Sequence, residues 1–123
     1  MSWFTIALAA GLLMLGVLPG AASPPRVHIT IESESPCFQP AVATATAGTA
    51  IRWENPTATH HTITHDGCVT DGPCAFDSGS LAPNETYTVP GLPPGNYPYH
   101  CRLHPIMRAV LTVSDPGNVP SQT

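Results

Sequence analysis

Side chains that can bind a soft metal stand at regular intervals late in this 123-residue chain: Cys101, His104 and Met107. A thiolate, an imidazole and a thioether belong to the donor set of a trigonal copper site, which takes two histidines, one cysteine and a weak axial methionine. The set lacks one histidine, which has to come from elsewhere in the chain. With that histidine, the spacing predicts a copper ion that carries single electrons.

Two adjacent histidines, His60 and His61, are candidates for the missing donor. Residues two apart in a strand share a face, so His61 lies on the same side as Ile63 while His60 faces the other way. We therefore expect His61 to be the ligand, with His60 as the alternative. The other histidines are expected to be exposed or structural, and they are His28, His65 and His100.

The residues around these donors resemble the cupredoxins, or blue copper proteins, and are closest to the amicyanin, pseudoazurin and plastocyanin-like members. Residues 101–108 read Cys-Arg-Leu-His-Pro-Ile-Met-Arg and match the amicyanin ligand loop, Cys-x-x-His-Pro-x-Met-Arg, at each fixed position. Residues 53–55 read Trp-Glu-Asn and match the family's Trp-x-Asn segment. The likeness extends over residues 41–113, most of the chain.

This resemblance implies one type 1 copper ion held by His61, Cys101, His104 and Met107. Neutral imidazole nitrogens suit both oxidation states of copper, and the thioether is a soft axial ligand that favours Cu(I). Thr62 departs from the family, because many relatives carry there an asparagine that supports the cysteine loop.

Short strands and turns dominate the rest of the chain, which contains 15 prolines and 10 glycines. Alternation of apolar and polar residues between turn signals predicts about eight strands, and hence a sandwich or barrel. The resemblance narrows this to an all-β, cupredoxin-like Greek-key sandwich. The expected strands are residues 27–31, 41–47, 49–54, 61–65, 75–78, 85–89, 96–100 and 108–113.

The first residues differ from the rest, because an almost wholly apolar run is followed by small residues. This pattern predicts a signal peptide, residues 1–22, cleaved near Ala22 or Ser23. An uncleaved membrane anchor is the alternative, although the apolar run is short for a spanning helix. One cupredoxin domain is expected at residues 26–114, followed by a flexible tail at 115–123. The mature protein would be periplasmic or otherwise extracytoplasmic, without stable membrane association.

The four cysteines fit an exported protein, because disulfides persist in oxidising compartments. If Cys101 binds the metal, three cysteines remain. Two of them, Cys68 and Cys74, enclose an Asp-Gly turn, and we expect a disulfide between them to close this loop. A bond from Cys37 to either of them is the alternative, since pairing cannot be read from sequence. This insertion has no place in the simplest family pattern.

Charge narrows the possible partners. Only 10% of the residues are charged, the net charge is -4 and all basic residues are arginines, so no nucleic-acid-binding patch is expected. Arg102 and Arg108 flank the ligand loop. They are either solvated side chains or a positive rim that steers an acidic redox partner.

Together these features predict a monomeric electron carrier that is not an enzyme. Redox partners would dock weakly near His104, where Leu103, Pro105 and Ile106 form a small apolar patch. Copper storage or delivery by the same fold is the alternative. A copper enzyme would need paired histidines for further copper sites, and the chain shows no such spacing.

Overall fold

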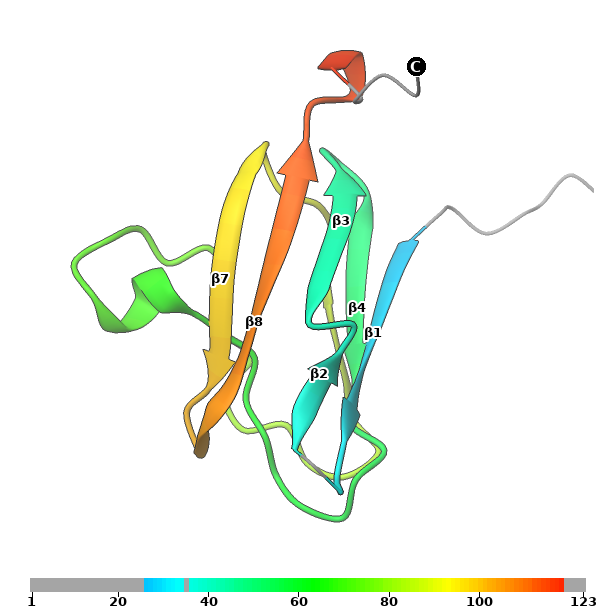
Figure 1. Ribbon diagram of the computed structural model, residues 1–123, viewed down its shortest axis with the longest axis vertical. Coiled ribbons are helices and arrows are strands. Elements are labelled where there is room, and N and C mark those ends of the chain that lie inside the picture. The colour runs from blue at the N-terminus through cyan, green and yellow to red at the C-terminus, as the bar shows by residue number, and fades with distance from the viewer. Residues whose placement is uncertain (1–25, 35, 119–123) are drawn as a thin grey trace, which may run out of the picture.

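Two four-stranded sheets packed face to face make up the computed structural model, which describes residues 26–34 and 36–118. One sheet has the strand order β2-β1-β4-β6 and the other the order β3-β8-β7-β5 (Figure 1). The predicted all-β sandwich is confirmed. Its strands are β1 (Arg26–Glu32), β2 (Cys37–Gln39), β3 (Val42–Thr46), β4 (Ala50–Glu54), β5 (Thr64–His65), β6 (Thr86–Val89), β7 (Gly95–Cys101) and β8 (His104–Ser114).

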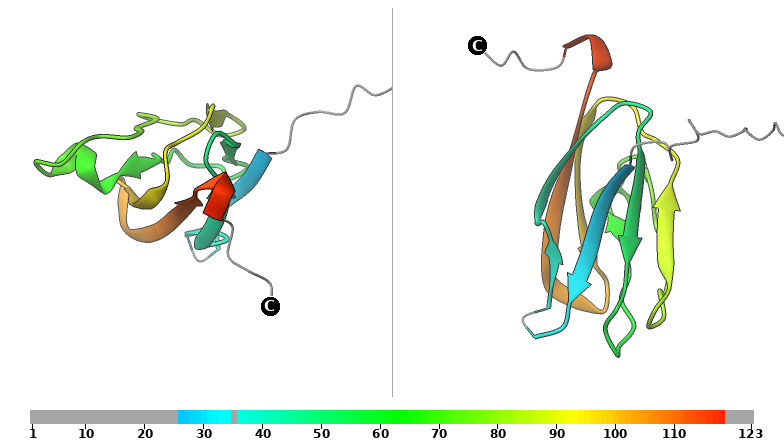
Figure 2. Two further views of the ribbon diagram at one scale, coloured as in Figure 1. Left: turned by 90° about the horizontal axis from the view of Figure 1, so that it is seen from above. Right: turned by 90° about the vertical axis from the view of Figure 1, so that its right-hand side faces the viewer.

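The chain crosses repeatedly between the sheets, and this produces parallel pairs in both. β1 runs parallel to β4 in one sheet and β3 runs parallel to β8 in the other, while the remaining strand pairs are antiparallel. Figure 2 shows β1, β4 and β6 side by side in its right panel. These crossings bring the late strands β7 and β8 against segments from the first half of the chain.

The core lies between the sheets and follows from the alternation within each strand. Ile29 in β1 and Ile51 and Trp53 in β4 are buried, whereas the residues next to them in each strand are partly or fully exposed. The indole Nε1–H of Trp53 donates a hydrogen bond of 3.1 Å to the hydroxyl of Tyr99 in β7. Trp53 is therefore a core residue, and it links the two sheets.

The segment after β4 differs from the predicted strands. Of residues 61–65, only Thr64–His65 forms a strand, while His61 makes an isolated bridge with Leu81. Residues 75–78 form no strand and make one bridge, through Asp77. Both predictions were too long, because residues 61–63 and 75–78 lie in loop segments on either side of β5 and make only isolated bridges.

The short strand Cys37–Gln39 was not predicted. It pairs antiparallel with β1 at the edge of its sheet and buries Phe38 completely. Three residues are too few to show a period of two, so the sequence carries no strand signal there.

The predicted signal peptide, residues 1–22, lies outside the described residues, as does the end of the predicted tail. Within that tail, Pro116–Asn118 forms a short 3-10 helix, η3. A second one, η2, spans Asp66–Val69. In residues 26–34 and 36–118, no helix has the length and apolar character needed to cross a membrane.

The turn between β7 and β8 lies at one end of the sandwich, and η3 lies at the other (Figure 1). This turn carries the Cys-x-x-His spacing noted in the sequence. The loop between β5 and β6, which contains η2, projects beside β7 (Figure 1).

Candidate metal centre

Three of the predicted donors lie together at the β7–β8 end of the sandwich. The ligand atoms of His61, Cys101 and His104 all lie within 4.8 Å of one another. Cys101 Sγ is 3.8 Å from His61 Nδ1 and 3.5 Å from His104 Nδ1. Met107 is in β8 and is 1% exposed. Within the described parts of the chain, this is the one cluster of histidine, cysteine and acidic side chains that could hold a metal ion.

Strand geometry explains why Cys101 and His104 are neighbours. Cys101 ends β7, His104 begins β8, and the two residues face each other across the antiparallel turn. His61 comes from a distant segment, which its bridge to Leu81 holds in place. His61 is 1% exposed and belongs to the cluster, while His60 is exposed.

Hydrogen bonds to the far side of the His61 ring leave Nδ1 for the metal. His61 Nε2 lies 3.1 Å from the hydroxyls of both Thr57 and Thr59. The Thr57 hydroxyl donates to Asn55 Oδ1 at 2.6 Å, so its oxygen is available to accept the Nε2–H of His61. With the proton on Nε2, the lone pair of Nδ1 points toward Cys101.

Asn55 organises the turn that leads to His61, and the sequence pattern did not reveal this role. Its side chain is fully buried, and its Nδ2 donates to the carbonyls of Thr59 and Leu81 at 2.9 and 3.1 Å. Its Oδ1 accepts the backbone N–H of Thr57 at 3.0 Å. The Asn-Pro-Thr sequence was a signal for such a turn, because asparagine often accepts a hydrogen bond from the backbone two residues later.

Thr62 ties the His61 segment to the cysteine loop. Its backbone N–H donates to Cys101 Sγ at 3.3 Å, a contact that favours a thiolate. Its hydroxyl accepts the backbone N–H of Arg102 at 2.8 Å. Although Thr62 replaces the asparagine of many relatives, it supports the cysteine loop through a hydrogen bond of its own.

The surroundings keep the His61 ring neutral. Burial, together with the nearby rings of His104 and His60, lowers the pKa of His61 below its ordinary value. A metal needs the neutral imidazole, so a lowered pKa lets the ring bind a metal at more acidic pH than a free histidine could.

His104 differs from His61 because it is only half-buried. Beside it, Leu103 is 53% exposed and Ile106 is 84% exposed, and Pro105 is also exposed. The residues of the predicted apolar patch are therefore exposed, and they stand next in sequence to the half-buried histidine of the cluster.

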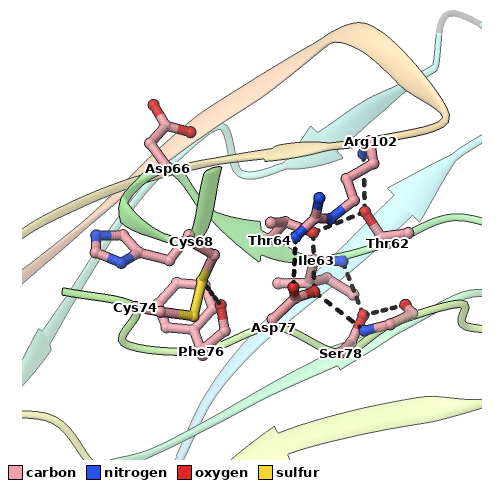
Figure 3. A network of polar contacts seen from close by, with 12 residues as sticks. Thr62, Ile63, Thr64, Asp66, Cys68, Cys74, Phe76, Asp77, Ser78 and Arg102 are labelled. Atoms are coloured by element: carbon pink, nitrogen blue, oxygen red, sulfur yellow. Dashed lines mark hydrogen bonds and ion pairs between the residues drawn. A yellow bond between two sulfur atoms is a disulfide. The ribbon is translucent and has the colours of Figure 1, made fainter. Parts of the chain in front are cut away.

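The two arginines beside the ligand segment are paired with aspartates. Arg102 Nη2 lies 2.8 Å from Asp77 Oδ2, and Arg108 Nη2 lies 2.7 Å from Asp66 Oδ2 (Figure 3 shows the Arg102–Asp77 pair). Both side chains are exposed, which agrees with the solvated alternative, and their charges do not form a free positive rim. Asp66 and Asp77 locally neutralise their charge.

Cys68 and Cys74 form the expected disulfide (Figure 3). Cys37 is half-buried and free, so the alternative pairings through Cys37 are wrong. The bond closes the loop that follows β5.

The remaining histidines have different environments. His28 is exposed, as expected, and pairs with Glu54 at 3.1 Å. His100 is buried and its Nδ1 lies 2.6 Å from Asp66 Oδ1, which is a structural role. His65 was expected to be exposed, but it is half-buried, and its Nδ1 accepts the N–H of Ala75, the residue that follows the disulfide-closed loop.

The donor set fits copper. One buried thiol, two imidazoles with Nδ1 turned inward and the buried thioether of Met107, three residues after His104 in the sequence, are the ligand types of a trigonal copper site with a weak axial methionine. A structural zinc site would instead be closed by four strong cysteine, histidine or carboxylate donors. Here only three such side chains meet among the described residues.

Comparison with known proteins agrees with this geometry. Residues 5–113 match the family model for the cupredoxin-like domain. Chloroplastic plastocyanin from Tetradesmus obliquus is 30% identical over 105 residues, which are 80% of this chain and 72% of that protein. Amicyanin-alpha from Methylorubrum extorquens is 29% identical over 117 residues, 89% of this chain and 95% of that protein.

Solved structures show the same fold. The reduced Cu(I) form of an amicyanin variant superposes with a TM-score of 0.63 at 21% identity, covering 76% of this chain and 87% of that one. The copper-containing nitrite reductase of Thermus scotoductus SA-01 gives a TM-score of 0.65 at 26% identity, covering 81% of this chain but 25% of the enzyme. Since the family match includes most of its length, this chain belongs to the cupredoxin-like family.

Proposed function

We propose that the protein is an exported blue copper protein that carries single electrons between redox partners. His61, Cys101, His104 and Met107 would hold the copper ion. The observation that carries the proposal is the gathering of three donor atoms, from segments about forty residues apart, within 4.8 Å of one another. The plastocyanin and amicyanin relatives support the same function.

Bound copper would supply the redox chemistry by alternating between Cu(II) and Cu(I). The protein's part is to keep the donors in place in both oxidation states, because small rearrangements make electron transfer fast. The Thr62 contacts fix the cysteine loop, and the Asn55–Thr57 hydrogen bond fixes the His61 ring. Cys101 and His104 are further held by their pairing across the β7–β8 turn.

Electrons would enter and leave through His104. It is the half-buried histidine of the cluster, and the exposed side chains of Leu103 and Ile106 lie next to it in sequence. A small apolar surface suits weak and short-lived docking, which a mobile carrier needs. Because the neighbouring arginines are paired with aspartates, we expect apolar contact to contribute more to docking than net charge.

Copper titration tests the site. The purified protein should turn blue on addition of Cu(II) and bleach with a mild reductant. Cys101→Ser should abolish the colour, because the thiolate–copper bond produces it. Cys37→Ser is the matched control, since Cys37 is the other free cysteine, and this variant should stay blue. A colourless Cu(II) form of the unmodified protein would contradict the proposal.

Electron self-exchange, measured by NMR line broadening in mixtures of the Cu(I) and Cu(II) forms, tests the docking surface. Ile106→Glu should slow self-exchange at least about tenfold by placing a charge on the apolar contact. Val42→Glu is the control, because Val42 is 65% exposed and pairs with Val110, roughly 20 Å along β8 from His104. Equal rates in both variants would refute docking at His104, and rapid copper loss with slow exchange would favour copper delivery.

Export is proposed because a disulfide needs an oxidising compartment, and Cys68–Cys74 forms one. The mature protein should be found outside the cytoplasm as a monomer that lacks residues 1–22. Mass spectrometry of the extracytoplasmic fraction and sedimentation of the purified protein measure this. An intact N-terminus in the membrane fraction would instead indicate an anchored carrier.

A further inference from the structure

The disulfide-closed loop folds tightly on itself beside β7. Its short helix η2 begins at Asp66, and its Cys68 is bonded to Cys74. Gly67 packs so closely on the opposite side of the loop that a Cβ atom there would lie 1.9 Å from the carbonyl oxygen of Pro73. The loop is therefore compact, and Asp66 projects away from the disulfide (Figure 3).

Asp66 contacts both strands of the ligand hairpin. Its Oδ1 lies 2.6 Å from His100 Nδ1, and its Oδ2 lies 2.7 Å from Arg108 Nη2. His100 and Arg108 are partners in the register of β7 and β8. His100 directly precedes Cys101, and Arg108 directly follows Met107. One carboxylate thus bridges the two residues that flank the ligand segment.

The His100 contact is the stronger of the two. The side chains of His100 and Asp66 are 11% and 24% exposed, whereas Arg108 is 59% exposed. An exposed ion pair contributes little by itself, but a hydrogen bond to a carboxylate in a partly buried site contributes more. In both the neutral Nδ1–H form and the imidazolium form, His100 can donate to Asp66.

A cavity lies between the tip of this loop and the ligand segment. This cavity of about 440 Å³ is lined by Val69 and Thr70 of the loop and by Pro105 of the ligand segment. Asp66 also lines this cavity, and its carboxylate links the loop to His100 and Arg108.

We propose that Asp66 is a positioning residue of the metal centre, because it holds the two ends of the Cys101–Met107 segment together through His100 and Arg108. The disulfide in turn holds Asp66 in place. This inference rests on the proposed copper site, but the contacts of the clamp involve none of the donor atoms and can be tested without metal.

Amide hydrogen exchange of the metal-free protein is the first test, because opening of the clamp exposes the backbone of the ligand segment. Asp66→Asn keeps the size of the side chain but cannot accept hydrogen bonds at both ends. It should speed exchange in residues 100–108 about tenfold, which corresponds to ~1.4 kcal/mol. Asp71→Asn removes the same charge from an exposed position in the same loop and should leave residues 100–108 unchanged. Equal exchange in the two variants would overturn the proposal.

The copper-loaded protein gives a second readout. Release of Cu(I) to a chelator should be several-fold faster in Asp66→Asn than in Asp71→Asn, and the Cu(II) spectrum should change only in Asp66→Asn. A normal spectrum and release rate, together with faster exchange, would show that Asp66 stabilises the hairpin without positioning the ligands, and would overturn the proposal. Absence of a blue form in the unmodified protein would refute the proposed function and leave the exchange test decisive for the clamp.

A second variant covers the case in which Asp66→Asn does not fold. Arg108→Gln breaks one arm of the clamp at a side chain that is 59% exposed, so the fold should persist. Its exchange in residues 100–108 should also rise, by a smaller factor because the His100 arm remains. Unchanged exchange in that variant would contradict the clamp.

Discussion

Asn55→Ala should destabilise the protein by more than an average substitution. The wild-type side chain is fully buried and takes part in four hydrogen bonds with three partners: Thr57, Thr59 and Leu81. Alanine can make none of these bonds. The same change removes the acceptor that orients the Thr57 hydroxyl toward Asn55 and away from His61.

The size of the stability loss depends on which of the groups bonded to Asn55 are left without any hydrogen-bond partner. The carbonyl of Leu81 also accepts the N–H of His61 at 3.1 Å, and the carbonyl of Thr59 lies 3.2 Å from the Thr57 hydroxyl, so both keep a donor. The backbone N–H of Thr57 loses its acceptor in a buried position. We therefore expect a loss of about 3 kcal/mol, about half of what four independent hydrogen bonds would give at ~1.5 kcal/mol each.

Urea unfolding of the metal-free protein measures this loss, with Asn96→Ala as the control. Asn96 accepts a 2.9 Å hydrogen bond from Thr112 at an exposed site, so its loss should cost no more than about 0.5 kcal/mol. Nitrogen chemical shifts of the His61 ring should move from the Nε2–H form toward a mixture of both tautomers in Asn55→Ala, but not in Asn96→Ala.

Asn55→Asp tests the hydrogen bonds separately from the packing, because aspartate keeps the size of the side chain but loses the Nδ2 donor. Its carboxylate would face the two carbonyl oxygens that Nδ2 now contacts, so the pKa of the new aspartate should be raised in the folded protein. A raised acid pKa means that the penalty grows as the pH rises above about 4, the ordinary pKa of aspartate. At neutral pH this variant should be at least as unstable as Asn55→Ala. Wild-type stability in the aspartate variant, or a loss below about 1 kcal/mol in the alanine variant, would refute the reasoning.

Further predictions concern the core, the loop and the cysteine support. Burial raises the pKa of Tyr99 from 10.0 to about 12, so stability should fall as the pH rises through this range, and Tyr99→Phe should remove that loss in unfolding measured against pH. Replacing Cys68 and Cys74 by serine should cost about 2 kcal/mol in urea unfolding, and reductant should destabilise the wild type but not this variant. Thr62→Val leaves the N–H of Arg102 without its acceptor and should cost about 1–2 kcal/mol, whereas Thr62→Ser should keep most of that stability. Equal unfolding of the valine and serine variants would argue against the hydroxyl's role.

The sequence was most informative where function depends on local spacing. Cys101 and His104 are near each other in the chain, and a tight turn between two strands was enough to bring their donors together. Alternation also favoured His61 over His60 for the inner position, and the structure buries His61 and exposes His60, although His61 makes only an isolated bridge. These inferences used the period of a strand, the donor preferences of a metal and the resemblance to the family's ligand pattern.

Contacts between distant segments could not be predicted in the same way. Asp66 meets Arg108 across 42 positions, and Arg102 meets Asp77 across 25. Each of these residues looked like an ordinary charged surface side chain, and no local pattern marks its partner. The positive rim considered as one alternative for the arginines could not be judged for this reason, since their charge is balanced by residues that only the fold brings near.

The position of the β7–β8 turn, at the opposite end of the sandwich from η3, has a practical consequence for immobilising the protein (Figure 1). A linker joined after Asn118 would leave from the end remote from His104. A protein attached to an electrode in this way would present its apolar patch to solution, so soluble partners could reach it while direct current from the electrode would be weak. Attachment through a cysteine at Ile106 would reverse this orientation and place the proposed electron port against the conductor.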